Sequence, residues 1–221
     1  MKLFINTLTK FICGFLLIGL LLFLPAGTLK YTGAWIFILL LFIPIFIMGV
    51  ILFIKNPELL KKRLDGKEKE KTQKGVVALS GLVFLGAFIV AGLDFRFGWS
   101  YIPKAVTIAA SVLFILSYLV YAEVIRENTY LSRTISVQEN QKVIETGLYS
   151  VVRHPMYAAT IIMFLMIPLI LGSWVSFIIF LAYPVIIAIR INNEEQILSK
   201  ELAGYTEYMQ KVKYKIIPFI W

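Results

Sequence analysis

The sequence predicts an all-α integral membrane protein with about six transmembrane helices. Hydrophobic residues make up 59% of the 221 residues and charged residues only 16%, which is more apolar side chain than a soluble domain of this size can bury. The apolar runs are also long enough to cross a bilayer. Residues 35–54 carry no charge, and 20 helical residues span ~30 Å, the thickness of the hydrocarbon core.

The first four predicted helices cover residues 10–26, 33–54, 76–93 and 103–125. No small-x-small cleavage pattern follows Leu24-Pro25, so we expect an uncleaved first helix. Asn56-Pro57 stops the second helix, and the mixed charges that follow predict a short solvated amphipathic helix. Cys13 is the only cysteine, which excludes an intramolecular disulfide and a cysteine metal site.

The second half begins with a polar segment, residues 127–153, which cannot span a membrane. Alternating residues at 134–144 indicate a small β-hairpin at the membrane surface. Helices are then predicted at 155–172, where Pro155 suits a first turn, and at 174–191. Only Gly172-Ser173 separates them, so they form a tight helical hairpin, whose short helices could pack obliquely or count as a single re-entrant unit. Apolar residues spaced by four and three predict an amphipathic C-terminal helix weakened by Gly204: Leu198, Leu202, Tyr205, Met209 and Val212.

The basic residues predict the orientation in the membrane. Of 22 lysines and arginines, 19 lie in the N-terminus and in segments 55–75, 126–153 and 190–221, and only Lys30, Arg96 and Lys104 lie on the other side. We therefore expect both termini to be cytoplasmic. The net charge of +9 is a topology signal and an attraction to anionic lipid, and we expect no nucleic-acid binding because the basic residues are spread among membrane loops.

Two polar clusters mark the ends of the predicted hairpin. The first, Arg153-His154-Pro155-x-Tyr157, holds the only histidine, and the second is Glu194-Glu195 after the last apolar run. A histidine before a proline is more often a helix cap, and an acidic pair alone is usually a solvated helix end. Together, at ends that the hairpin brings close, they predict a site, because polar groups in such an apolar protein are costly without partners.

The chemistry of these clusters points to a ligand with both charges. The start of a helix presents free N–H groups that suit a carboxylate or phosphate. Tyr149 and Tyr157 offer flat rings that stack on a heterocycle or face a cation, and the glutamates supply the opposite charge. A ligand with a carboxylate, an amine, an aromatic base and a cationic centre matches this set, and S-adenosyl-L-methionine is such a ligand.

The same residues resemble the isoprenylcysteine carboxyl methyltransferase family, whose wider group includes the phospholipid methyltransferases. The similarity covers residues ~130–221, and the first hundred residues resemble the family only as hydrophobic spans. The resemblance implies an S-adenosyl-L-methionine-dependent integral membrane methyltransferase. It also implies a substrate tunnel within residues 1–125 and a cofactor-binding catalytic region at 126–221. The positions that carry it are Gly147, Tyr149, Arg153, His154, Pro155, Tyr157, Arg190, Ile191, Glu194, Glu195, Leu198, Tyr205, Tyr208, Pro218 and Phe219.

The resemblance further assigns roles to residues. It implies that Arg153 and Glu195 are catalytic and that His154 binds the cofactor, and no metal is expected. A carboxylate or thiolate acceptor needs no base, whereas an amine or thiol would have to lose a proton to His154 or a glutamate. Tyr205 and Tyr208 could equally be interfacial aromatics. The implied cofactor-binding residues are Gly147, Tyr149, His154, Pro155, Tyr157, Arg190, Glu194, Glu195, Leu198, Tyr205 and Tyr208.

Three other interpretations stay open from the sequence. The acceptor could be a phospholipid amine rather than a lipophilic carboxylate or thiol of isoprenylcysteine type. A membrane sterol-type reductase that uses NADPH has a similar Arg-His-Pro-x-Tyr helix start, although Glu194-Glu195 favours the methyltransferases. A non-enzymatic membrane protein or small transporter is disfavoured, because the span centres carry no ionisable residue. In a bacterium, such a protein would lie in the cell membrane.

Overall fold

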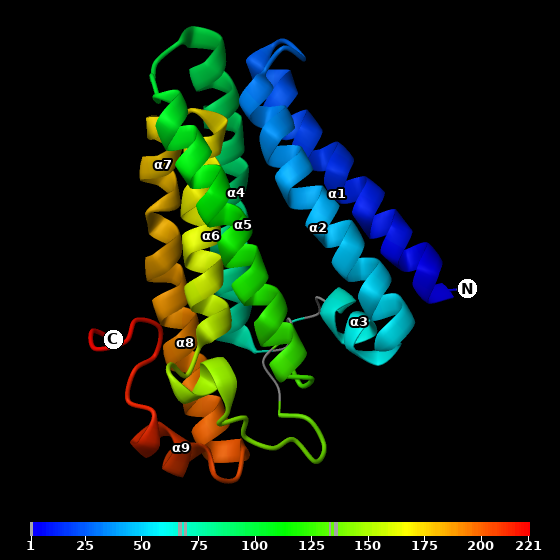
Figure 1. The fold of residues 1–221 in the computed structure, drawn as a ribbon, viewed down its shortest axis with the longest axis vertical. Helices are drawn as coiled ribbons and strands as arrows, with labels where there is room; N and C mark the ends of the chain where they lie inside the picture. The colour runs from blue at the N-terminus through cyan, green and yellow to red at the C-terminus, as the bar shows by residue number, and fades with distance from the viewer. Residues whose placement is uncertain (1, 66–67, 69, 133, 135–136) are drawn as a thin grey trace.

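The computed structural model describes residues 2–65, 68, 70–132, 134 and 137–221, and within these the chain is helical with no strand (Figure 1). The all-α prediction is therefore confirmed. The helices are α1 (Lys2–Ala26), α2 (Thr32–Lys55), α3 (Pro57–Leu64), α4 (Lys71–Phe97), α5 (Lys104–Glu127), the 3₁₀ helix η1 (Gly147–Ser150), α6 (Pro155–Leu171), α7 (Trp174–Phe180), α8 (Ala182–Glu201) and α9 (Tyr205–Lys211).

Five of the described helical stretches are long and apolar enough to cross a membrane: α1, α2, α4, α5 and the stretch Trp174–Glu201, which contains α7 and α8. The sixth predicted span is α6, whose 17 residues extend about 25 Å, somewhat less than the ~30 Å of a bilayer core. Gly172, with a φ of 83°, ends α6, and the Ser173 side chain caps α7. The tight hairpin is therefore present.

Two glycines allow helices to cross at close range. A Cβ at Gly92 in α4 would lie 2.6 Å from the Leu22 carbonyl oxygen of α1, and a Cβ at Gly33 in α2 would lie 2.8 Å from that of Ile170 in α6. At the same end of the molecule, the Tyr31 hydroxyl donates to the Leu171 carbonyl at 2.6 Å. The α1–α2 pair is thus fixed to the bundle at this end. Figure 1 shows that the pair diverges from α5 toward the opposite end of the molecule.

The predicted β-hairpin does not form in the part of segment 134–144 that the structure describes, residues 134 and 137–144; Ile135 and Ser136 lie outside it. Side chains hold this segment where a strand ladder was expected. The Gln138 backbone N–H donates to the Gln141 side chain at 2.9 Å, and the Gln138 amide donates to the Tyr130 carbonyl at 2.5 Å. Such local side-chain bonds compete with regular backbone pairing.

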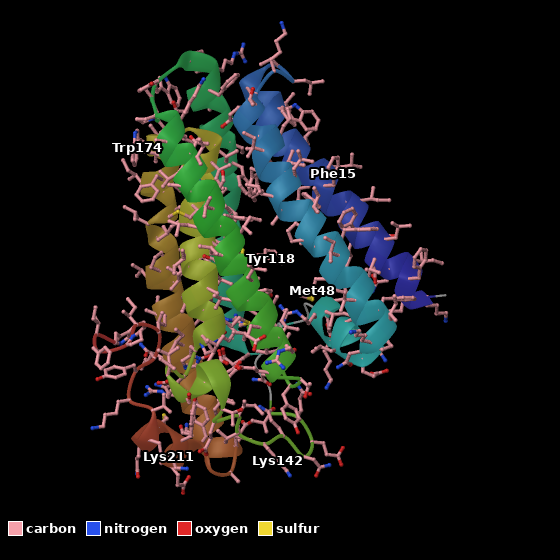
Figure 2. All side chains as sticks on the ribbon, in the orientation of Figure 1. Phe15, Met48, Tyr118, Lys142, Trp174 and Lys211 are labelled. Carbon is pink, nitrogen blue, oxygen red and sulfur yellow. The ribbon has the colours of Figure 1, made fainter. Side chains whose placement is uncertain are left out.

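The amphipathic tail is present in two pieces. α8 ends at Glu201 and α9 begins at Tyr205, because Gly204 adopts a φ of 84°. The predicted apolar face nevertheless forms one cluster that buries Leu202, Tyr205 and Val212 against Leu198 and Met209. The apolar residues spaced by four and three therefore pack together even though the helix breaks at Gly204. This cluster covers the end of the molecule where Lys211 lies (Figure 2).

Candidate functional site

The helical hairpin brings the two polar clusters together, as its topology predicts. The Arg153 Nε atom donates to Glu195 Oε1 at 2.7 Å, and the His154 Nε2 atom lies 3.1 Å from the same oxygen. All three residues are buried, with 6–8% of their surface exposed. Since a buried charge needs a partner, the carboxylate of α8 stabilises the start of α6.

The chain beyond α9 returns to cover this start. The backbone N–H groups of Arg153 and His154 donate to the carbonyls of Tyr214 and Lys215 at 2.9 and 2.8 Å. The Arg153 Nη1 atom donates to the carbonyls of Val212 and Lys213 at 2.7 and 2.8 Å. In this structure the tail therefore supplies the acceptors of both backbone N–H groups, and anion binding at the start of the helix stays a prediction.

A second network of hydrogen bonds, next to the one around Glu195, joins α6, α8 and α4. The Tyr157 hydroxyl donates to Glu194 Oε2 at 2.6 Å and accepts from Arg190 Nε at 2.8 Å. Arg190 Nη1 in turn donates to the Gln73 side chain at 2.9 Å, and Gln73 is fully buried. Hence Arg190 and Glu194, four residues apart on one helix face, are held in place by groups from two other helices.

Gly147 has a steric function in this geometry. Its φ is 56°, and a Cβ there would overlap the Glu127 carboxylate, which accepts from the Leu148 N–H at 3.1 Å. Glu127 at the end of α5 thereby caps η1. Tyr149 follows directly, and its hydroxyl accepts from the Asn128 side chain at 3.0 Å. The glycine thus allows the capping that fixes Tyr149.

These elements enclose a cavity of about 110 Å³. Three predicted site residues, Gly147, Pro155 and Glu195, do not line it. The predicted residues that do line it are Tyr149, Arg153, His154, Tyr157, Arg190, Glu194, Leu198, Tyr205 and Tyr208. The rest of the lining comes from loop residues between Asn128 and Ile144 and from Met156 and Leu202.

Two neighbouring tyrosines of α9 differ in how their hydroxyls are used. The Tyr208 hydroxyl donates to the Tyr149 carbonyl at 2.7 Å. The Tyr205 hydroxyl is buried and has no hydrogen-bond partner among the described residues, although it belongs to the cavity wall. Burial, and then the charges of Glu195 and Glu194, raise the pKa of Tyr205 well above its usual range. Its hydroxyl is therefore a protonated donor available to a ligand.

Sequence reasoning missed several residues of this site. Lys215 lies 3.1 Å from Glu195 Oε2 and also donates to Asn192 at 2.6 Å. Gln73 and Asn128 hold Arg190 and Tyr149, as described above. Each is a polar residue beside the end of an apolar run, which is also what a solvated helix end looks like. For Gln73, full burial is the distinguishing feature, and only the fold reveals it.

The fold and the site define a helical membrane protein with a polar cavity at one end of the bundle, and the comparisons give its class. Residues 104–203 match the phospholipid methyltransferase family. The match spans 100 of the 221 residues, and it confirms the resemblance predicted from the sequence. Because this is a family of methyltransferases, it indicates a membrane methyltransferase. No curated protein matches the chain.

Proposed function

We propose that the protein is an S-adenosyl-L-methionine-dependent methyltransferase that acts on a lipophilic acceptor in the membrane. One observation carries this proposal: every residue that lines the cavity, except Tyr205 and Tyr208, lies within the segment that matches the family. The match thus falls on the walls of one cavity as well as on apolar spans.

The residues present fit the cofactor. Glu194 offers a carboxylate to an amine or to ribose hydroxyls, Tyr205 offers an unused donor, and the rings of Tyr149 and Tyr157 offer stacking surfaces. Pockets that bind drug-sized ligands measure roughly 300–1,000 Å³. Since the cavity measures about 110 Å³, the lining side chains must move apart on binding.

The protein's contribution to the reaction is positioning and exclusion of water. When bound, the cofactor supplies an electrophilic methyl group on a sulfonium. Glu195 holds Arg153 and His154 through the contacts given above, and this favours a positioning role for Glu195. The catalytic assignment of Arg153 and Glu195 stays a prediction. Burial of the wall residues lowers the local dielectric, which strengthens the electrostatic interactions of bound groups.

The acceptor determines whether a base is needed. A lipophilic carboxylate or thiolate arrives charged, and we rank this class first. A phospholipid amine is the second candidate, and the name of the matching family favours it. An amine must lose a proton before attack, and His154 and Glu194, which both line the cavity, are the groups that would accept it.

Binding of S-adenosyl-L-methionine to detergent-purified protein, measured by calorimetry, tests the proposal. We expect binding that Glu194→Gln weakens roughly tenfold or more, because a charge-assisted hydrogen bond is lost. Glu207→Gln is the matched control, since Glu207 is exposed on α9. If the wild-type protein bound NADPH and no S-adenosyl-L-methionine, the reductase interpretation would replace this one. Turnover with lipid carboxylates, thiols and phospholipid amines then identifies the acceptor.

A further inference from the structure

A second cavity, of about 490 Å³, lies between the α1–α2 pair, α3 and α5, where α2 leans away from the bundle (Figure 1). Its walls are almost wholly apolar. Met48 of α2 and Tyr118 of α5 both line it, and Figure 2 labels them on facing helices. Phe4, Leu8 and Phe46 line it and are exposed, so the cavity opens to the surrounding bilayer.

Donor groups gather at one end of this cavity. Arg63 of α3 donates to the Tyr121 hydroxyl through Nη2, and its guanidinium lies 5.2 Å from the centroid of that ring. Tyr118 lies beside Tyr121, with 6.0 Å between ring centroids. Lys10 of α1 donates to the carbonyl of Leu64, the residue after Arg63. Among the described lining residues there is no carboxylate to balance these cations.

Arg63 carries an unused donor. Its Nη1 atom is buried and has no hydrogen-bond partner among the described residues, and no ion pair joins Arg63 to a carboxylate there. A buried, unpaired N–H of a charged group is costly, which indicates that a ligand satisfies it. Arginine binds phosphate and carboxylate in a planar fork. Several donors around one point favour phosphate, which has more acceptor oxygens.

We propose that this cavity holds an acyl chain of a phosphate-bearing lipid and that Arg63 binds the phosphate. The apolar walls fit the chain, and the donors at one end fit the anionic group. A lipid is the occupant because the open side of the cavity faces the bilayer and its length is lined by side chains such as Phe11, Phe42 and Leu52.

The position of this cavity relates it to the candidate functional site. Tyr121 and Ile125 of α5 line it, and two residues further on Glu127 caps η1. Asn128, the next residue, donates to the hydroxyl of Tyr149, and both line the first cavity. Under the proposed function, the lipid headgroup would lie beside the cofactor. This last step rests on the proposed function, whereas the lipid binding does not.

Native mass spectrometry in neutral detergent tests lipid binding without turnover. Protein is titrated with phosphatidylglycerol, with diacylglycerol of the same acyl chains, and with oleic acid. We expect retention of phosphatidylglycerol over diacylglycerol, and Arg63→Gln should weaken it roughly tenfold while Arg63→Lys retains part of it. Arg126→Gln is the control, because Arg126 pairs with Glu123 on the exposed face of α5.

A second variant tests the chain-binding part. Gly49 lines the cavity, and a Cβ there meets no atom within 4 Å, so Gly49→Phe introduces a ring at the cavity wall. It should reduce retention of phosphatidylglycerol and diacylglycerol alike, whereas Gly81→Phe on α4, also in open space, should not.

Equal retention of the two lipids, or an Arg63→Gln protein that behaves as Arg126→Gln, would overturn the proposal. Oleic acid binding as tightly with the same Arg63 dependence would overturn the phosphate assignment. Lost cofactor binding with intact lipid binding would instead count against the proposed function alone.

Discussion

Tyr205 and Tyr208 show how two buried residues of the same type, three positions apart, differ in what they do. Both are at least 96% buried on α9. The Tyr208 hydroxyl has a protein acceptor, whereas the Tyr205 hydroxyl has none among the described residues. A hydroxyl with a protein partner contributes to folding, and a buried hydroxyl without one is explained best by a ligand.

We predict that removing the Tyr205 hydroxyl weakens ligand binding, whereas removing the Tyr208 hydroxyl lowers stability. Tyr205→Phe should leave the midpoint of thermal unfolding unchanged and weaken S-adenosyl-L-methionine binding about three- to tenfold, the effect of one neutral hydrogen bond. Tyr208→Phe should lower the unfolding midpoint, because the Tyr149 carbonyl loses its donor. Calorimetry and thermal unfolding of both variants check this. Unaltered affinity in Tyr205→Phe would remove Tyr205 from the binding site.

The sequence predicted many of the residues that line the first cavity, because their spacing is local. Arg153, His154 and Tyr157 lie within one turn of the start of a helix, and Arg190 and Glu194 share one face of another. It did not reveal the acceptors, which are backbone carbonyls of Val212 to Lys215. Every residue has a backbone carbonyl, so the sequence does not show which carbonyls accept hydrogen bonds from Arg153 and His154. Only the folded structure identifies the segment Val212 to Lys215 that covers the start of α6.

At the scale of elements, one position without a side chain, Gly92, allows α4 and α1 to pack closely. Gly92 allows α1 to cross α4 closely, whereas Gly86, six residues earlier on the same helix, has no atom within 4 Å of a Cβ. Both are glycines within an apolar helix, and the sequence gives no means of telling them apart. In a membrane the lipid is as apolar as the protein, so the hydrophobic effect does not drive helices together. Small residues at helix contacts allow the close van der Waals packing that does.

The two glycines provide a matched test of this crossing. Gly92→Ala should lower the free energy of unfolding by about 1–3 kcal/mol, since the new methyl group overpacks the contact with Leu22 and Pro25. Gly86→Ala should leave it unchanged or raise it by up to about 1 kcal/mol, because alanine favours the helix. Thermal unfolding in one detergent compares them. Equal effects would show that α1 and α4 do not pack this closely.

For the whole molecule, hydrophobic runs predicted the order of the spans but not their arrangement. The α1–α2 pair diverges from α5, and the second cavity exists because of this divergence. Apolar positions that face lipid and those that face another helix look alike in sequence, so neither the angle nor the cavity was predictable.

Orientation is the property of the whole molecule that the distribution of basic residues predicts. In a Cys13→Ser background, Lys30→Cys lies between α1 and α2, and Lys213→Cys lies in the tail at the opposite end. With intact cells, a thiol reagent that does not cross membranes should label the first and not the second, and permeabilised cells should label both. Labelling of Lys213→Cys alone in intact cells would place the candidate site outside the cell.

The segment Val212 to Lys215, which covers the start of α6, also has a consequence for how the protein is made. Ribosomes synthesise chains from the N-terminus, so Arg153 and His154 reach the membrane surface well before Glu195 and the tail carbonyls exist. During this interval a guanidinium and an imidazole destined for burial have only water and lipid headgroups as partners. A nascent chain that stops before residue 212 has all of its apolar helices and Glu195, yet Arg153 still lacks the carbonyl acceptors of the tail.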